Sequence, residues 1–157
     1  MTTIRSKSDF IKQFKFKVIP TNNKIPIITD WRNQATYNPH INSKSYACLA
    51  GGTPYQDGFL VVIDLDNHEK KQELSGIEYW DNALLPTDTF TVKTPNDGKH
   101  LYFKASKEQI DELKTLGSGY VIAPQIEMFW NDKHLVMGAF SITNDGIYEI
   151  EKNIKVI

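Results

Sequence analysis

Hydrophobic and polar positions follow a helical pattern at the start of the chain and then lose it. Apolar Phe10, Ile11 and Phe14 recur at helical spacing after Ser8, whose hydroxyl can accept a free backbone N–H. These positions predict a short amphipathic helix with Ser8 as its N-cap. The next segment, FKVIPTNNKIPIITDW, contains prolines and paired asparagines that break helices. It predicts an extended, turn-containing stretch that ends at Trp31.

Beyond this stretch, Asn38-Pro39 predicts the start of another short helix, with proline in its first turn. From Tyr46 onward, short apolar runs alternate with turn residues, a pattern that predicts strands. The runs are YACLA, FLVVIDLD, TFTVKT, HLYF, YVIA, QIEMFW, HLVM and IYEI. Two helical patterns lie between them: Ser75 can cap residues 76–82, and Ser106 with Gln109 has capping-box spacing.

Strands mixed with helices, with several strand pairs only a tight turn apart, predict an α+β fold. We expect a mixed or antiparallel sheet with flanking helices. A chain of 157 residues with 40% hydrophobic and 24% charged content can bury a real core but would be crowded as two domains. We therefore expect a single domain over residues 1–157.

Composition and charge exclude several classes of protein. No apolar run approaches the roughly 20 residues of a membrane helix, and the N-terminus lacks an apolar signal segment. We expect a cytoplasmic protein without a membrane partner. The lone Cys48 cannot form an internal disulfide, and four scattered histidines give no spacing for structural zinc. A net charge of −1 argues against coating DNA by bulk electrostatics, so any contact with nucleic acid must be local.

The run FLVVIDLD carries the most informative pair of residues. Alternation along a strand places Asp64 and Asp66 on one face, while Ile63 and Leu65 point to the other. Two adjacent carboxylates at the end of a buried strand repel each other unless a cation neutralises them. Divalent metals with oxygen ligands fit this need, and two-metal phosphoryl transfer uses such a pair. A strand that runs into a polar turn is the alternative interpretation.

The run TFTVKTPNDGKHLYF predicts a β-hairpin over residues 89–103, because Pro95-Asn96-Asp97-Gly98 tolerates tight-turn conformations. His100 begins the return strand, where it is either a functional group or a polar residue at a strand edge. Lys99, beside the flexible Gly98, is a candidate phosphate contact, as are the backbone N–H groups of the turn.

A third carboxylate, Glu127, lies within the apolar run QIEMFW. An acidic residue there either reaches solvent on an exposed strand face or binds a cation, because burying it unpaired is costly. Asp132 in the following turn is the other candidate, although turn aspartates often serve backbone hydrogen bonds.

Several segments, in order along most of the chain, resemble the N-terminal primase-polymerase domain of the archaeo-eukaryotic primase superfamily, best known from plasmid and phage replication proteins. The segments are Lys24-Ile25-Pro26, Ile28 to Trp31, Ala35-Thr36, Cys48 to Gly52, Val61 to Asp66, Leu85-Pro86-Thr87, Thr94-Pro95 and Gly98 to Phe103. Two positions depart from the family pattern. Glu127 stands where the family commonly has Asp, and Gly138-Ala139-Phe140-Ser141 replaces a Pro-x-Ser element.

The resemblance implies the RRM-like archaeo-eukaryotic primase catalytic core and a DNA-directed nucleotidyltransferase that uses Mg²⁺ or Mn²⁺. It assigns the metal ions to Asp64, Asp66 and Glu127, and the phosphates of the incoming nucleotide to His100. The implied partners are a single-stranded or primed DNA template and nucleoside triphosphates, together with a replicative helicase or accessory domain in trans, since the chain carries no helicase motif. A nonenzymatic nucleotide- or template-binding module and a metal-dependent nuclease are the alternatives.

Overall fold

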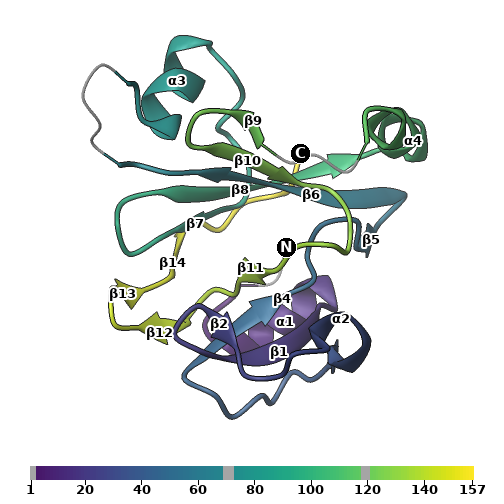
Figure 1. Ribbon diagram of the computed structural model, residues 1–157, viewed down its shortest axis with the longest axis vertical. Coiled ribbons are helices and arrows are strands. Elements are labelled where there is room, and N and C mark those ends of the chain that lie inside the picture. The colour runs from purple at the N-terminus through teal and green to yellow at the C-terminus, as the bar shows by residue number, and fades with distance from the viewer. Residues whose placement is uncertain (1–2, 69–72, 118–120) are drawn as a thin grey trace.

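The structure, a computed structural model, describes residues 3–68, 73–117 and 121–157, which form layers of sheet and helix (Figure 1). The helices are α1 (Lys7–Phe14), α2 (Trp31–Gln34), α3 (Gly76–Asn82) and α4 (Lys107–Thr115). The strands are β1 (Lys17–Asn22), β2 (Ile25–Pro26), β3 (Thr36–Tyr37), β4 (Ser45–Cys48), β5 (Pro54–Tyr55), β6 (Gly58–Leu65), β7 (Thr91–Lys93), β8 (Lys99–Ala105), β9 (Val121–Ala123), β10 (Ile126–Phe129), β11 (Val136–Met137), β12 (Ile142–Thr143), β13 (Gly146–Ile147) and β14 (Glu149–Lys152).

Two sheets carry the fold. The main sheet has seven strands in the order β14-β7-β8-β6-β10-β9, with β5 also paired to β6. The second sheet has the order β11-β4-β1-β2, with β3 paired to β1, and β12 with β13 forms a separate hairpin. All pairings among the described strands are antiparallel, so the α+β prediction is confirmed with an antiparallel rather than a mixed sheet.

The main sheet is covered differently on its two faces. We call the face toward α3 and α4 the outer face and the face toward α1 and the second sheet the inner face (Figure 1). Val61, Ile63 and Leu65 of β6 pack on the outer face with Trp80 of α3 and Ile110 of α4. The alternation of β6 therefore buries every second side chain beneath helices and sends the others into the space between the sheets.

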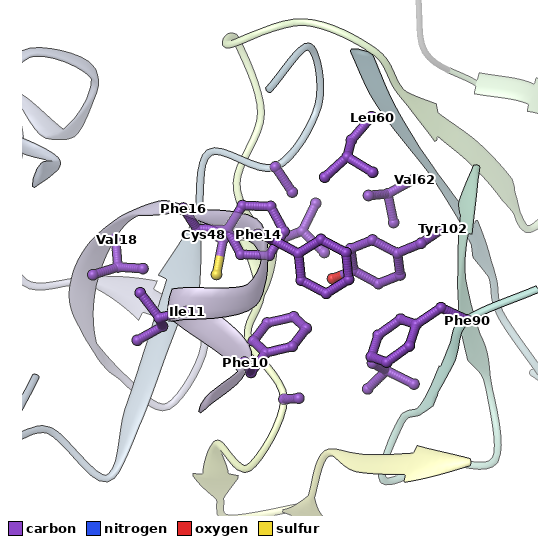
Figure 2. Packing of buried hydrophobic residues seen from close by; sticks show 14 of the residues in the cluster. Phe10, Ile11, Phe14, Phe16, Val18, Cys48, Leu60, Val62, Phe90 and Tyr102 are labelled. Atoms are coloured by element: carbon purple, nitrogen blue, oxygen red, sulfur yellow. The ribbon is translucent and has the colours of Figure 1, made fainter. Parts of the chain in front are cut away.

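The core between the sheets is largely aromatic. Phe10 and Phe14 of α1 point toward Tyr102 of β8 and toward Phe90, which directly precedes β7 (Figure 2). The rings of Phe14 and Phe90 meet edge to face with centroids 5.2 Å apart, and Phe14 stacks on Tyr102 at 5.6 Å. Aromatic pairs in these arrangements add to the stabilisation from burial alone. The amphipathic pattern of residues 10–14 thus fixes α1 against both sheets.

The predictions about capping and turns were partly right. Ser75 and Ser106 cap α3 and α4 as expected, and Ser106 forms the full capping box with Gln109. The predicted hairpin is confirmed as β7 and β8, joined through residues 94–98. Ser8, however, lies inside α1. Its N-cap is Ser6, whose extended backbone lets the hydroxyl accept the Asp9 N–H.

Between residues 28 and 40, one prediction was wrong and one short helix was not predicted. No helix follows Asn38-Pro39, because the Asn38 side chain accepts the His40 N–H and stabilises a local turn instead. A one-turn helix, α2, begins at Trp31 directly after the stretch predicted as extended. The N–H groups of Asn33 and Gln34 donate to the carbonyl of its N-cap, Asp30, and close the turn.

Ser141, in the segment that departs from the Pro-x-Ser element, has a structural role. Ser141 is fully buried, and its hydroxyl accepts the Tyr46 N–H and donates to the Tyr46 carbonyl, both at 3.1 Å. This pair of bonds joins the segment after β11 to β4.

In the described part of the chain, no helix has both the length and the apolarity that a membrane span requires.

Candidate active site

The candidate site is built on one row of residues across the main sheet. β6 lies between β8 and β10, and the register sets His100 of β8 and Glu127 of β10 directly opposite Asp64. Side chains at directly paired positions point to the same face of a sheet. The three polar side chains therefore project together from the inner face, at the end of the aromatic core.

Asp66 joins this row because the chain after β6 is held on both sides. Its N–H donates to the Gln125 carbonyl and its carbonyl accepts the N–H of Gly76 at the start of α3. The Gln125 side chain also exchanges two hydrogen bonds with the His68 backbone. Gly76 lies so close to Gln125 that an added Cβ would fall 2.2 Å from its carbonyl oxygen, so a larger residue would displace this contact.

The structure brings three carboxylates together. Ligand atoms of Asp64, Asp66 and Glu127 all lie within 4.8 Å of one another. Burial, and then the neighbouring charges of Asp66 and Glu127, raise the pKa of Asp64 to about 8. Burial and Asp66 likewise raise the pKa of Glu127. Carboxylates held this way repel one another unless a cation is present, and their oxygens are the ligands preferred by hard divalent metals, so the triad fits such an ion.

His100 is the most buried polar group of the site, with 5% of its surface exposed. Its Nε2 lies 3.6 Å from Asp64 Oδ1, and its Nδ1 has no hydrogen-bond partner among the described residues. Burial, with a smaller effect from Lys24, lowers its pKa to about 4. The imidazole is therefore neutral at physiological pH and can act as a hydrogen-bond donor or acceptor rather than as a cation.

The row opens into a cleft of about 260 Å³ between the two sheets. Asp64, Asp66 and His100 line it from the main sheet, and Gly98 lines it from the β7–β8 turn. Gly98 is tightly packed, since an added Cβ would lie 2.7 Å from the Leu65 carbonyl oxygen. A glycine is required for the turn to lie this close to the end of β6.

Two of the predicted site residues lie elsewhere. Lys99 does not line the cleft, and its Nζ pairs with Glu151 Oε2 at 3.4 Å. Asp132, the other candidate for the third acid, pairs with Arg32 at 3.1 Å on the surface and is not part of the carboxylate cluster. Of the two candidates, Glu127 is the one that joins Asp64 and Asp66, although it is not among the residues that line the cleft.

The structure also shows two residues in the cleft that the motif analysis did not assign to a site. Tyr148 packs its ring near His100 with centroids 5.9 Å apart, and burial raises its pKa to about 12. Lys24 lines the cleft from the β1–β2 turn. The Lys-x-Pro segment was the only signal for Lys24, and nothing in the local sequence distinguishes Tyr148 from a core tyrosine.

Carboxylates clustered on a sheet beside an open cleft are characteristic of enzymes that transfer phosphoryl groups with divalent metals. A comparison with protein families gives the same class: the family model described as "Bifunctional DNA primase/polymerase, N-terminal" (Prim-Pol) matches residues 8–156. The chain belongs to this family, which implies a DNA primase/polymerase nucleotidyltransferase acting on a DNA template and nucleotides. No curated protein matches the chain in sequence.

Proposed function

We propose that this cleft is where the chain joins nucleotides on a DNA template, with Asp64, Asp66 and Glu127 as ligands of Mg²⁺ or Mn²⁺. The observation that carries the proposal is the triad itself, whose ligand atoms gather within 4.8 Å beside a cleft in a member of the Prim-Pol family. Divalent ions bound there would supply the activation of the primer 3′-hydroxyl and neutralise charge on the reacting phosphate.

The protein residues orient the reactants. The carboxylates of Asp64 and Glu127, on neighbouring strands, fix the ligand atoms in a rigid sheet rather than on a loop. His100 adjoins Asp64 and offers a neutral N–H to a nucleotide phosphate. Gly98 lets the β7–β8 turn approach the same space. Lys99, whose side chain lies on the outer face and pairs with Glu151, is not part of this proposal.

The wider context is part of the proposal. An antiparallel sheet with helices on one face agrees with the RRM-like primase core, and the family match over residues 8–156 agrees with one catalytic unit. The family resemblance favours replication of a plasmid or phage. With a net charge of −1, the chain can neutralise few template phosphates by itself, which favours a helicase or accessory domain in trans.

The test is incubation with a primed template, nucleoside triphosphates and either Mg²⁺ or Mn²⁺. We expect extension of the primer, and no extension by Asp64→Asn or after chelation of the metal. Cleavage of the template would identify a nuclease instead. Nucleotide or DNA binding with neither extension nor cleavage would identify a nonenzymatic module.

A further inference from the structure

One lysine lines the cleft together with Asp64 and Asp66 of the acidic triad. Lys24 comes from the second sheet and lines the same cleft as Asp64 and His100 of the main sheet. It is the only lysine or arginine among the described residues that line this cleft. Its charge acts on both of those groups, since it lowers the pKa of Asp64 against the stronger effect of burial and contributes to the low pKa of His100. A polyanion entering the cleft therefore meets one positive side chain opposite the metal ligands.

The backbone of Lys24 is held in place at the tip of a hairpin. Asn22 pairs with Ile25, so Asn23 and Lys24 form a two-residue turn in which Asn23 takes a φ of +55°. The Asn23 side chain accepts the N–H of Asn144, which lies in the β12–β13 turn. Asparagine tolerates this left-handed conformation better than most residues do, and its side chain ties the two turns together. Figure 1 shows the β12–β13 hairpin beside the β1–β2 hairpin.

The side chain of Lys24, by contrast, is held only weakly. Its Nζ lies 3.4 Å from Asp145 Oδ2, and 52% of the Lys24 side chain and 50% of the Asp145 side chain are exposed. Ion pairs exposed to this extent contribute little to stability, so the lysine can exchange one anion for another at small cost. A phosphate group offers it more charge and more acceptor oxygens than a carboxylate does.

We propose that Lys24 binds the terminal phosphates of the incoming nucleoside triphosphate and releases Asp145 when it does so. The inference rests on the function proposed above, which puts the reacting α-phosphate at Asp64, Asp66 and Glu127. Lys24 lines the cleft from the second sheet and Asp64 and Asp66 line it from the main sheet. Because the Lys24 side chain is half-exposed, it remains accessible to the β- and γ-phosphates of a nucleotide bound at the triad. Template DNA is the less suitable occupant, because backbone phosphates are held by several cations in a row and Lys24 lines the cleft alone.

The experiment compares Lys24→Met, which removes the charge and keeps the length, with Lys93→Met as the matched control. Lys93 also forms a half-exposed ion pair, with Asp97 at 3.3 Å, but does not line the cleft. The measurements are Kd values for nucleoside tri- and monophosphates with Mn²⁺, Kd for primer–template, and the KM and kcat of primer extension.

We expect Lys24→Met to raise the triphosphate Kd and KM about tenfold or more, as for a lost charged hydrogen bond, and to leave the monophosphate Kd unchanged. Lys24→Arg should restore most of the loss, and Lys93→Met should match the wild type. Asp145→Asn should tighten triphosphate binding about twofold, because it removes the competing anion. If Lys24→Met unfolds, Lys24→Gln gives the same comparison.

Three results would overturn the inference while leaving the proposed function in place: an unchanged triphosphate Kd in Lys24→Met, an equal weakening of mono- and triphosphate, or a loss confined to primer–template binding. A wild-type protein that neither binds triphosphate nor extends a primer would instead refute the proposed function, and the role of Lys24 with it.

Discussion

The two faces of the main sheet are made by the same strands but have opposite effects on the stability of the fold. On the outer face, Ile63 and Leu65 are buried under helices among other apolar side chains. On the inner face, their sequence neighbours Asp64 and Asp66 gather with Glu127 in a cluster of repelling carboxylates. The outer face lowers the free energy of the fold, whereas in the absence of a cation the carboxylates on the inner face raise it.

This difference shows how a strand can carry a stable core and an electrostatically unfavourable site at once. Because side chains alternate along a strand, the apolar residues on one side fix the backbone that positions the acids on the other. Substitutions at adjacent positions should therefore have different consequences. The outer face should control stability, and the inner face should control chemistry.

The largest effect is expected from paired substitutions at neighbouring positions of β6. Asp64→Asn should reduce primer extension roughly a thousandfold or more, because it removes a metal ligand, and should leave the fold intact. Ile63→Ala should cost about 2–5 kcal/mol of stability, as buried Ile truncations do, and retain activity per folded molecule. Urea titrations and extension assays on both variants provide the measurement. An active Asp64→Asn protein with a lowered Tm would contradict the comparison.

A smaller effect is expected at the next position of the row. His100→Ala should raise the KM for nucleoside triphosphate about tenfold, because a phosphate contact is lost, and should change Mn²⁺ affinity little. Leu101→Ala, on the outer face, is the matched control and should lower Tm without changing KM. Steady-state kinetics and metal titration separate these outcomes. Identical kinetics for His100→Ala and the wild type would remove His100 from the site.

The next prediction concerns the pH dependence of stability without metal. Burial and the neighbouring acids raise the pKa of Asp64 in the folded state to about 8, whereas an unfolded chain releases this proton at about pH 4. This group therefore lowers the free energy of unfolding as pH rises from about 4 to about 8. His100 has the opposite effect between about pH 4 and 6.5, where the unfolded chain binds the extra proton.

Between about pH 6.5 and pH 8, the effect of Asp64 on the free energy of unfolding can therefore be measured without the opposite effect of His100. There we expect the Tm of the metal-free protein to fall by several degrees as pH rises, and Asp64→Asn or added Mn²⁺ to reduce the fall. Thermal melts of both proteins with EDTA and with Mn²⁺ measure it. If the Tm of the variant and the Tm of the wild type fall in parallel as pH rises, Asp64 is not the group that causes the fall.

The smallest effect is expected from Glu127→Asp, which shortens the third acid by one methylene. We expect extension to fall only several-fold, with a changed ratio of Mg²⁺- to Mn²⁺-supported rates, because the ligand type remains while its reach changes. Met128→Leu, at the next position of β10, is the control and should leave that ratio unchanged. A loss as large as that of Asp64→Asn would mean that the length of Glu127 is critical.

The sequence alone predicted those features of the two sheet faces that depend on the local order of apolar and polar residues. Alternation in FLVVIDLD correctly separated Ile63 from Asp64, and the capping residues Ser75 and Ser106 were found from their spacing. The family resemblance is confirmed by the match over residues 8–156. The assignment of catalytic roles to individual residues stays a prediction.

What the sequence could not supply was the pairing of distant segments. That Glu127 rather than Asp132 joins the triad follows from the register of β10 on β6, which no local pattern fixes. The same holds for Lys24, which reaches the cleft only because the second sheet faces the main one. Lys99 is a different case, because alternation along β8 turns its side chain to the opposite face from His100 and the local pattern could have excluded it.

The hydrogen bond between Asn23 and Asn144 joins residues that are 121 positions apart. A contact of such high sequence separation forms only when a long loop closes, which costs conformational entropy. A ribosome-bound chain that has not yet released Asn144 therefore cannot complete the entrance to the cleft. During synthesis, the turn that carries Lys24 therefore gains this support only after a segment 121 residues further along the chain has emerged.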